Sequence, residues 1–257
     1  MQKLLLLIIT MIIGLFISTT VLKGQDLSNK NSVETKTFNL GSFNAVKSSQ
    51  AIEVEIVKSN EEKAVATSNY ISELNIEVKN KTLYIQYKPN VSLQNADTKV
   101  VVYMKDLIKA EAENASHIRV KSVFNNATQT FETRAAGKIF VDSKADNIYI
   151  NLTNAGEFSG KVDSKKLYVN ISSASTAKLS GSADNAEISA DSASNLDAKN
   201  VVIKTAKVYA TATSSVTLSV SQELTAEATS LAKIKYKTLS GIKFSAIRKS
   251  GGKIDSI

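Results

Sequence analysis

The stretch that decides the fold is residues 148–194, IYINLTNAGEFSGKVDSKKLYVNISSASTAKLSGSADNAEISADSAS. A run that alternates apolar and polar residues leads to a tripeptide of small residues, and a second alternating run follows it. The tripeptides NAG, SAS and SAS end at Gly156, Ser175 and Ser194, so the unit returns at equal intervals. A fixed period of about 20 residues indicates a solenoid, in which each repeat stacks on the next.

The same unit continues in both directions along the chain. Earlier copies are NAS ending at Ser116 and AAG ending at Gly137, and weaker later copies are ATS ending at Ser214 and ATS ending at Ser230. The intervals between copies stay nearly constant up to Ser214, and the last one is shorter. Because stacked strands lie about 4.8 Å apart, seven such coils predict a rod of very roughly 30 Å.

Alignment on the tripeptide predicts which side chains point inward. Positions eight, six and four before its last residue are apolar, and so are positions two and four after it. The inward set is Ile148, Ile150, Leu152, Leu167, Val169, Ile171, Ala186, Ile188, Ala190, Ala206, Val208, Ala210, Ile118, Val120, Ile139, Val141, Ala177, Leu179, Leu196, Ala198, Val216 and Leu218. Period-two alternation is typical of strands with one buried face. Two strands per repeat are too few for a propeller blade. The predicted fold is therefore all-β, a parallel β-helix, right-handed by the general preference for right-handed crossovers.

The middle residue of the tripeptide is small in every copy. It is Ala115, Ala136, Ala155, Ala174 and Ala193, then Thr213 and Thr229. We expect a sharp bend there, at which a larger side chain would collide with the copies above and below. This column is interpreted as structural.

Residues 38–106 follow a different pattern, with alternating runs at 51–57, 74–78, 83–87 and 100–104. The Asn80-Lys81 pair between two of these runs predicts a hairpin turn. Because a solenoid needs a cap at an open end, this segment is expected to be a strand-rich N-terminal cap on β-helix repeats at 107–240. Residues 25–37 are polar without periodicity and are expected to be a flexible lead-in.

Residues 1–24 predict export. Lys3 precedes an apolar run from Leu4 to Ile17, after which small polar residues follow, the order of a secretory signal peptide. An uncleaved N-terminal anchor is the alternative, since the run nearly reaches spanning length. Both interpretations place the rest of the chain outside the cytoplasm, periplasmic, secreted or at the cell surface. After signal removal we expect no stable membrane span.

The composition excludes several kinds of chemistry. The chain of 257 residues has no Cys, no Trp, a single His and a single Pro, while apolar residues make up 43% and charged residues 22%. Without Cys there is no thiolate nucleophile, no disulfide and no lipid attachment of the lipoprotein type. One His cannot build a His-rich metal site. No metal and no cofactor are expected.

The positive charge is concentrated at the end of the chain. The full sequence carries +8, and residues 233–257 hold seven Lys and Arg against Asp255 alone. Arg and aromatic residues are not interleaved there, so nucleic acid is not expected as a partner. We interpret residues 241–257 as a solvated basic tail. The alternative is contact with an anionic polysaccharide or membrane, to which Lys233, Lys235 and Lys237 would contribute.

Three stretches resemble a known family. They are FNAV at Phe43–Val46, VVVYMKDL at Val100–Leu107 and EAENASHIRV at residues 111–120, all after a signal-like start. The sequence is similar to the head-GIN-domain family of secreted bacterial proteins, the putative autotransporter adhesins, over roughly residues 38–250. The resemblance implies a β-helical fold, export from a Gram-negative cell and an adhesin-like role. It supplies no catalytic residues, and NAG and SAS stand where the family's GIN would be.

Candidate sites are few. Glu111 and Glu132 fall in one outward column with Arg134 diagonal to both. They form either a carboxylate pair for a polysaccharide lyase or glycosidase, or an ion-pair ladder. Tyr149 and Tyr168 share an outward column in adjacent repeats, as a sugar-stacking surface or as a cross-strand pair. His117 occupies an outward slot that varies between repeats and is not expected to be a catalytic base.

The sequence thus predicts a non-enzymatic binding module, adhesin-like, at the cell envelope. Its partner would be an envelope or host glycan or a protein surface. Coils of nearly constant length leave no inserted loops to wall a cleft, which argues against the alternative, a polysaccharide-acting enzyme.

Overall fold

A computed structural model describes residues 32–238 and 241–257, and the expected signal peptide, residues 1–24, lies outside them. Residues Val33–Ile257 form one unit, whose described residues form strands and one 3-10 turn, η1 (Ile71–Glu73). The strands are β1 (Glu34–Asn39), β2 (Ala45–Ser48), β3 (Glu53–Lys58), β4 (Lys63–Ser68), β5 (Leu74–Lys79), β6 (Thr82–Tyr87), β7 (Thr98–Met104), β8 (Lys109–Glu113), β9 (His117–Val120), β10 (Thr128–Arg134), β11 (Lys138–Phe140), β12 (Ser143–Leu152), β13 (Glu157–Ile171), β14 (Thr176–Ala190), β15 (Asn195–Ala210), β16 (Ser215–Ala228), β17 (Lys233–Thr238), β18 (Lys243–Arg248) and β19 (Lys253–Ser256). Within the described part of the chain, no helix is long and apolar enough to span a membrane.

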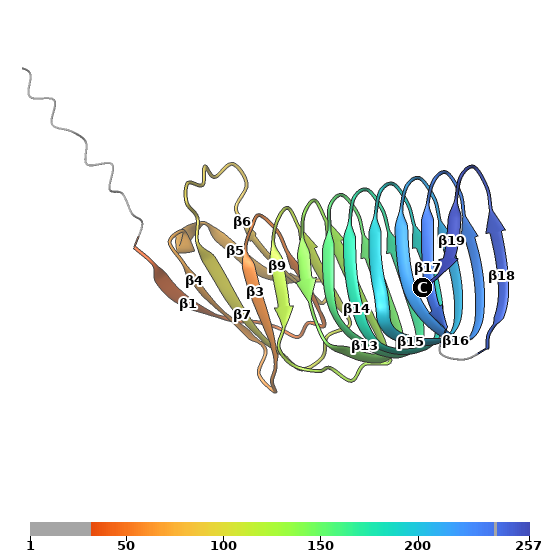
Figure 1. The fold of residues 1–257 in the computed structure, drawn as a ribbon. Coiled ribbons are helices and arrows are strands. Elements are labelled where there is room, and N and C mark those ends of the chain that lie inside the picture. The colour runs from red at the N-terminus through yellow and green to blue at the C-terminus, as the bar shows by residue number, and fades with distance from the viewer. Residues whose placement is uncertain (1–31, 239–240) are drawn as a thin grey trace, which may run out of the picture. The chain divides into compact units, whose positions relative to one another are not determined.

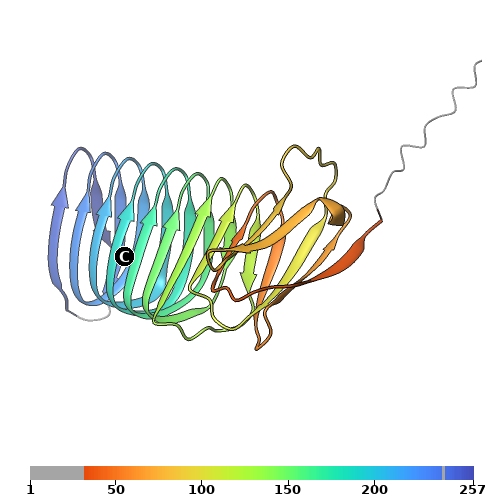
Figure 2. The same cartoon turned by 180° about the vertical axis from the view of Figure 1, so that it is seen from behind.

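The strands stack as two walls of a β-solenoid, as predicted (Figure 1). Wall 1 contains β6, β2, β8, β10, β12, the second halves of β13 to β16, and β18. Wall 2 contains β7, β3, β9, β11, the first halves of β13 to β16, β17 and β19. The long strands β13 to β16 bend from wall 2 into wall 1, so the ladders join into one sheet (Figure 2).

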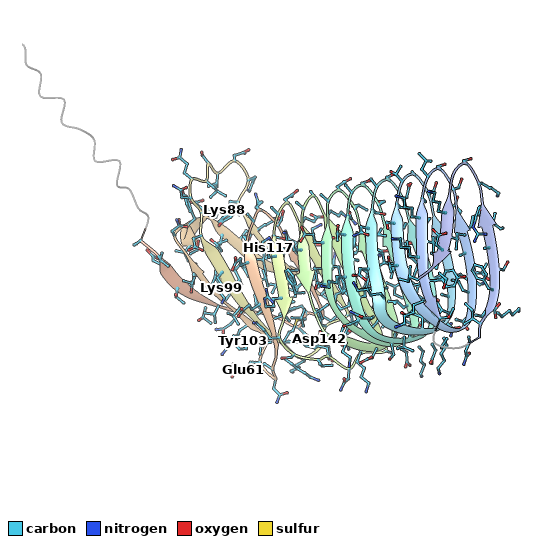
Figure 3. The ribbon with its side chains drawn as sticks, viewed as in Figure 1. Glu61, Lys88, Lys99, Tyr103, His117 and Asp142 are labelled. Atoms are coloured by element: carbon cyan, nitrogen blue, oxygen red, sulfur yellow. The ribbon has the colours of Figure 1, made fainter. Side chains whose placement is uncertain are left out.

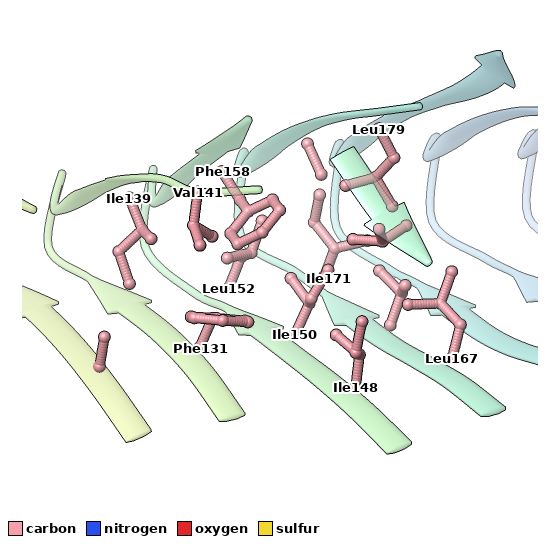
Figure 4. Close-up of a cluster of buried hydrophobic side chains, with 14 of the residues drawn as sticks. Phe131, Ile139, Val141, Ile148, Ile150, Leu152, Phe158, Leu167, Ile171 and Leu179 are labelled. Carbon is pink, nitrogen blue, oxygen red and sulfur yellow. The ribbon is translucent and has the colours of Figure 1, made fainter. Parts of the chain in front are cut away.

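The core lies between the walls and consists of the predicted inward columns. Every residue of the inward set is buried. In the region of β10 to β14, Phe131 and Ile150 from wall 1 meet Phe158 and Ile139 from wall 2 (Figure 4). The rings of Phe131 and Phe158 have centroids 5.6 Å apart. At about 25 cal/mol per Å² of buried apolar surface, these stacked layers supply the main stabilising term of the fold.

The corner between the walls is a type I′ turn at the small tripeptide. At Asn154 and Ala155 the φ angles are 53° and 60°, and the N–H of Gly156 donates to the carbonyl oxygen of Thr153 at 3.2 Å. The N–H of Ala155 donates to the carbonyl oxygen of Ser173 in the next turn at 2.9 Å. Hydrogen bonds between turns therefore continue through the corner.

The reason expected for the small middle residue is wrong. The middle residues point to solvent, and one of them is Leu231, 61% exposed. The third residue is the buried one, as at Ser116 and Ser214. A Cβ at Gly137 would overlap the carbonyl oxygen of Ala112 in the preceding turn. Small residues are required at the third position, where the chain enters wall 2 against its neighbour.

The last predicted copy also needs correction. The two residues with positive φ are Ser230 and Leu231, and the buried third residue is Ala232. The copy therefore ends at Ala232 rather than at Ser230, which brings the last interval close to the others. The string ATS matched the earlier tripeptides, but the inward alternation of Ala226 and Ala228 places Thr229 before the turn.

The expectation of a solvated basic tail at 241–257 is wrong for the described residues. β18 pairs with β16 and β19 pairs with β17, joined by a further corner at Ser250-Gly251. Ile254 is 3% exposed. Lys243, Lys253 and Asp255 occupy outward positions, which is compatible with a stacked strand. Arg248 is the exception: it is in register with the inward Ala228, and its guanidinium donates to the carbonyl oxygen of Ile254 at 2.8 Å.

At the N-terminal end, spatial order and chain order differ. β2 and β3, joined at a Gln50-Ala51 corner, lie between β6/β7 on one side and β8/β9 on the other. Residues expected in the cap thus form solenoid layers. The antiparallel additions are β5 on β6, through the predicted Asn80-Lys81 hairpin turn, β4 on β7 and β1 on β4. β1 replaces the expected flexible lead-in over residues 34–37, because its pairing with β4 extends the edge of wall 2.

Candidate functional site

The outer face of wall 1 carries most of the predicted site residues. Two neighbouring outward columns run along it from turn to turn. One reads Lys47, Glu111, Glu132, Asn151, Asn170, Ser189, Tyr209 and Glu227. The other reads Lys109, Thr130, Tyr149, Tyr168, Glu187, Lys207 and Thr225. The acidic residues and the tyrosines are therefore adjacent regions of one face.

The acidic residues belong to a charged cluster, defined as Lys47, Lys109, Glu111, Glu113, Glu132 and Arg134. Lys47 bonds Glu111 and Glu113, both at 2.9 Å. Lys109 lies 3.4 Å from Glu111 and 3.0 Å from Glu132. Arg134 lies 3.2 Å from Glu132 and 3.9 Å from Glu111, the diagonal contact expected from the sequence. Each carboxylate in the cluster has a cationic partner.

The charges of this cluster shift the pKa values of its members. Burial by itself would raise the pKa of Glu111, but the hydrogen bond from Lys47 and the positive charge of Lys109 outweigh it and lower that pKa to about 2. Burial would likewise lower the pKa of Lys47, yet its hydrogen bonds to Glu113 and Glu111 raise it. A glycosidase acid needs a raised pKa to be protonated near neutral pH. Glu111 is therefore held in the wrong protonation state for that role.

The second predicted pair is brought together as a ring stack. The centroids of Tyr149 and Tyr168 are 4.7 Å apart and their planes are 5° from parallel. Beside them the amide nitrogen of Asn170 donates to the amide oxygen of Asn151 at 3.0 Å. Both contacts follow the strand spacing, so the stack and the amide ladder are supported by the sheet itself.

Sequence reasoning missed the continuation of this face beyond Tyr168. Glu187 and Lys207 follow Tyr168 in the same column, and Tyr209 follows Ser189 in the neighbouring one. A hollow of about 420 Å³ lies here, bounded by Tyr168, Tyr209 and Ile247. Tyr209 is 45% exposed. The column alignment contained the signal for Glu187, Lys207 and Tyr209, but these residues have no neighbour of their own type in their columns, unlike Tyr149 and Tyr168.

The remaining predicted residues lie on wall 2. His117 is in register with Glu53, Lys138, Glu157 and Thr176, as the outward slot predicted (Figure 3). Lys233, Lys235 and Lys237 line the exposed side of β17. The structure therefore does not bring these lysines together with the tyrosines. In the described residues no cluster of three or more His, Cys, Asp or Glu is suited to a metal ion.

The fold and this face define a class, a capped β-solenoid with regular turns and broad, ladder-lined outer surfaces. The family described as "Putative auto-transporter adhesin, head GIN domain" matches residues 42–238, and the chain belongs to it. No curated protein matches the chain.

Solved structures confirm the fold. A putative adhesin from Parabacteroides merdae is 16% identical, with a TM-score of 0.81 over 88% of this chain and 96% of that one. A putative adhesin from Parabacteroides distasonis is 15% identical, with a TM-score of 0.80 over 88% and 98%. A protein from the same species, described as a putative lipid binding protein, has a TM-score of 0.75 at 15% identity over 88% and 97%.

Proposed function

We propose that this chain is an exported, non-enzymatic binding module at the envelope of a Gram-negative bacterium, and that the outer face of wall 1 is its contact surface. Membership of a family named for adhesion supports a binding role over an enzymatic one. The observation that carries the proposal is the character of this face: it is built from regular turns, with every carboxylate of the charged cluster ion-paired and a half-buried tyrosine stack beside it.

Such a face suits recognition of an extended surface. Aligned side chains repeat at the strand spacing, so a long partner meets the same chemistry at successive turns. Exposed aromatic rings supply contact area at low entropic cost, while the surrounding amides and charges supply hydrogen bonds. The partner would be a glycan or a protein surface of the envelope or of a host.

The test is a binding screen of the purified protein against arrays of glycans and of envelope and host surface proteins. Two matched variants block one wall each with the same bulky side chain: Ser189→Arg on wall 1 and Thr176→Arg on wall 2, both at exposed positions. We expect Ser189→Arg to abolish binding and Thr176→Arg to retain it. The reverse result would overturn the assignment of wall 1 and transfer the contact surface to wall 2.

Two further readings separate the alternatives. Binding that weakens at high salt and is lost on replacing Lys233, Lys235 and Lys237 by Gln would assign the contact to the basic strand β17, since exposed charge contacts are screened. Release of reducing ends from a bound glycan, abolished by Glu132→Gln, would replace the binding role by a hydrolytic or lyase activity.

A further inference from the structure

We propose that the row Tyr168, Glu187 and Lys207 on wall 1 is a binding site for an oligosaccharide, with one sugar ring stacked on the free face of Tyr168. The inference rests on the proposed function and names the ligand class of that surface. It extends the tyrosine pair to three side chains that follow one another on adjacent strands β13, β14 and β15.

The ring stack ends at Tyr168 with one face uncovered. Tyr149 covers the other face at a centroid distance of 4.7 Å. At the next rung of the column the residue is Glu187, which offers no ring. The hollows on this side are accordingly bounded by Tyr168 but not by Tyr149. A pyranose ring presents a flat apolar C–H face that packs against an aromatic ring at a similar distance.

Within the part of the chain that the structure describes, the two charged groups of the row have no partners. Glu187 and Lys207 are direct neighbours on adjacent strands, and both are exposed. Among the described residues, neither the Glu187 carboxylate nor the Lys207 ammonium makes a hydrogen bond or an ion pair. In the charged cluster of the same face, by contrast, every carboxylate is paired. The Glu187 carboxylate is therefore a free acceptor, and the Lys207 ammonium a free donor, beside the end of the stack. Together they can form hydrogen bonds with two adjacent hydroxyl groups of a sugar.

The surface is hollowed on both sides of the row. One hollow of about 420 Å³ lies on the side of Ser189 and Tyr209, and another of about 290 Å³ lies on the side of Asn185 and Thr205. Tyr168, Glu187 and Lys207 border both hollows. The ligand that fits is therefore a chain of sugars that crosses the row and places units on either side, rather than a single monosaccharide.

Tyr209 extends the site along the solenoid. It lies two strands from Tyr168 and one outward position further along its strand, so its ring is roughly 10–12 Å away by strand geometry. That separation is about the length of two sugar units. The small side chain of Ser189 lies between the two tyrosines and leaves room for a ligand there. The hollow between them is the path for the chain toward a second stacking contact.

The experiment is titration of the purified protein with defined hexasaccharides, namely cellohexaose, chitohexaose, mannohexaose and galactohexaose. Binding is read by saturation-transfer NMR and by intrinsic fluorescence, which comes from tyrosine because the chain has eight Tyr and no Trp. We expect at least one hexasaccharide to bind and Tyr168→Ala to weaken it about tenfold or more, the loss of one stacked ring. Glu187→Gln should weaken it severalfold with the fold unchanged by circular dichroism.

Tyr149→Ala is the matched control. It removes the same ring from the same column but leaves the free face of Tyr168, so affinity should stay within about threefold of the wild type. Equal loss in both variants, or wild-type affinity in Tyr168→Ala, would overturn the site while leaving wall 1 as a binding face. Silence with all four hexasaccharides, together with a protein hit in the array screen that Ser189→Arg abolishes, would overturn the sugar site alone. Silence in both experiments would overturn the proposed function as well.

Discussion

The ring of Tyr149 lies flat on the ring of Tyr168, with centroids 4.7 Å apart and planes 5° from parallel. Parallel strands lie about 4.8 Å apart, so the sheet sets the ring separation and the rings need no distortion to meet it. The stack therefore follows from the geometry of the sheet, and it borders the proposed sugar site.

The stack should contribute to folding as a coupled pair. In a double-mutant cycle with Tyr149→Ala and Tyr168→Ala, we expect a coupling free energy of about 0.5–1.5 kcal/mol, because each ring loses its partner in either single variant. Urea unfolding of the four proteins measures it. Strictly additive losses would show that the two rings do not stabilise each other.

The corner turns predict opposite effects for two neighbouring residues. Ala136→Gly should raise the free energy of unfolding by about 0.5–1 kcal/mol, because Ala136 is exposed and its φ of 61° suits Gly better than Ala. Gly137→Ala should lower it by about 2 kcal/mol, because its Cβ would overlap the carbonyl oxygen of Ala112. Thermal unfolding of both variants measures the two changes in stability. Equal effects would contradict the assignment of the third tripeptide residue as the buried one.

The charged cluster predicts a specific loss of stability in acid. The folded-state pKa of Glu111 is lowered to about 2, so its contribution is fully present above the ordinary value of about 4.3 and is lost as the pH falls through about 2. Glu111→Gln should cost about 2 kcal/mol at neutral pH, since Lys47 and Lys109 each lose one of their two carboxylate partners, and should flatten the pH dependence between about 4.5 and 2.

Glu157→Gln is the control for that measurement. Glu157 pairs with Lys138 at 3.0 Å, but its side chain is 48% exposed, so the loss should stay below about 1 kcal/mol. Stability profiles from pH 2 to 7 by denaturant unfolding compare the two variants. A profile of Glu111→Gln as steep as the wild type would contradict the lowered pKa.

The last turn should be protected from solvent. The N–H groups of Lys249 and Lys253 donate to the carbonyl oxygens of Ala228 and Ala232, at 3.0 and 2.9 Å. We expect their hydrogen exchange to be slowed by at least about 100-fold relative to an unstructured peptide. Ile254→Asp should abolish this protection, because Ile254 is buried between the walls. If these N–H groups of the wild type exchange as fast as those of an unstructured peptide, residues 241–257 are a solvated tail, and the stacked last turn is wrong.

The sequence alone predicted the cross-section of the solenoid but not the order of all its layers. Period two separates inward Ile150 from outward Tyr149 without knowledge of any partner strand, because alternation is a property of each strand. The repeat spacing then aligned Tyr149 with Tyr168 and Glu111 with Glu132, since successive turns stack in chain order there.

Before residue 107 the turns do not stack in chain order, since the partners of Val54 are Val100 and Ile118. No local pattern states which strand of similar composition will be the neighbour. The prediction for the last turn was wrong for a different reason. Its many charged residues obscured the alternation of inward and outward positions, which Phe244 and Ile254 still follow. The unpaired state of Glu187 and Lys207 was also beyond prediction, because adjacency of opposite charges in the sequence pattern indicates a salt bridge by default.

The β2/β3 layer lies between β6/β7 and β8/β9. This arrangement determines the order in which strands can pair as the chain emerges N-terminus first. Residues 45–58 find no complete pairing until residue 120 has appeared, so the opening segment waits, with its strand edges unsatisfied, for about half the chain. Once that group of layers closes, every later turn has a finished template and adds in order of appearance. A chaperone that holds the unfolded chain would therefore matter most while residues 45–58 wait for their partner strands. The later turns can assemble without it.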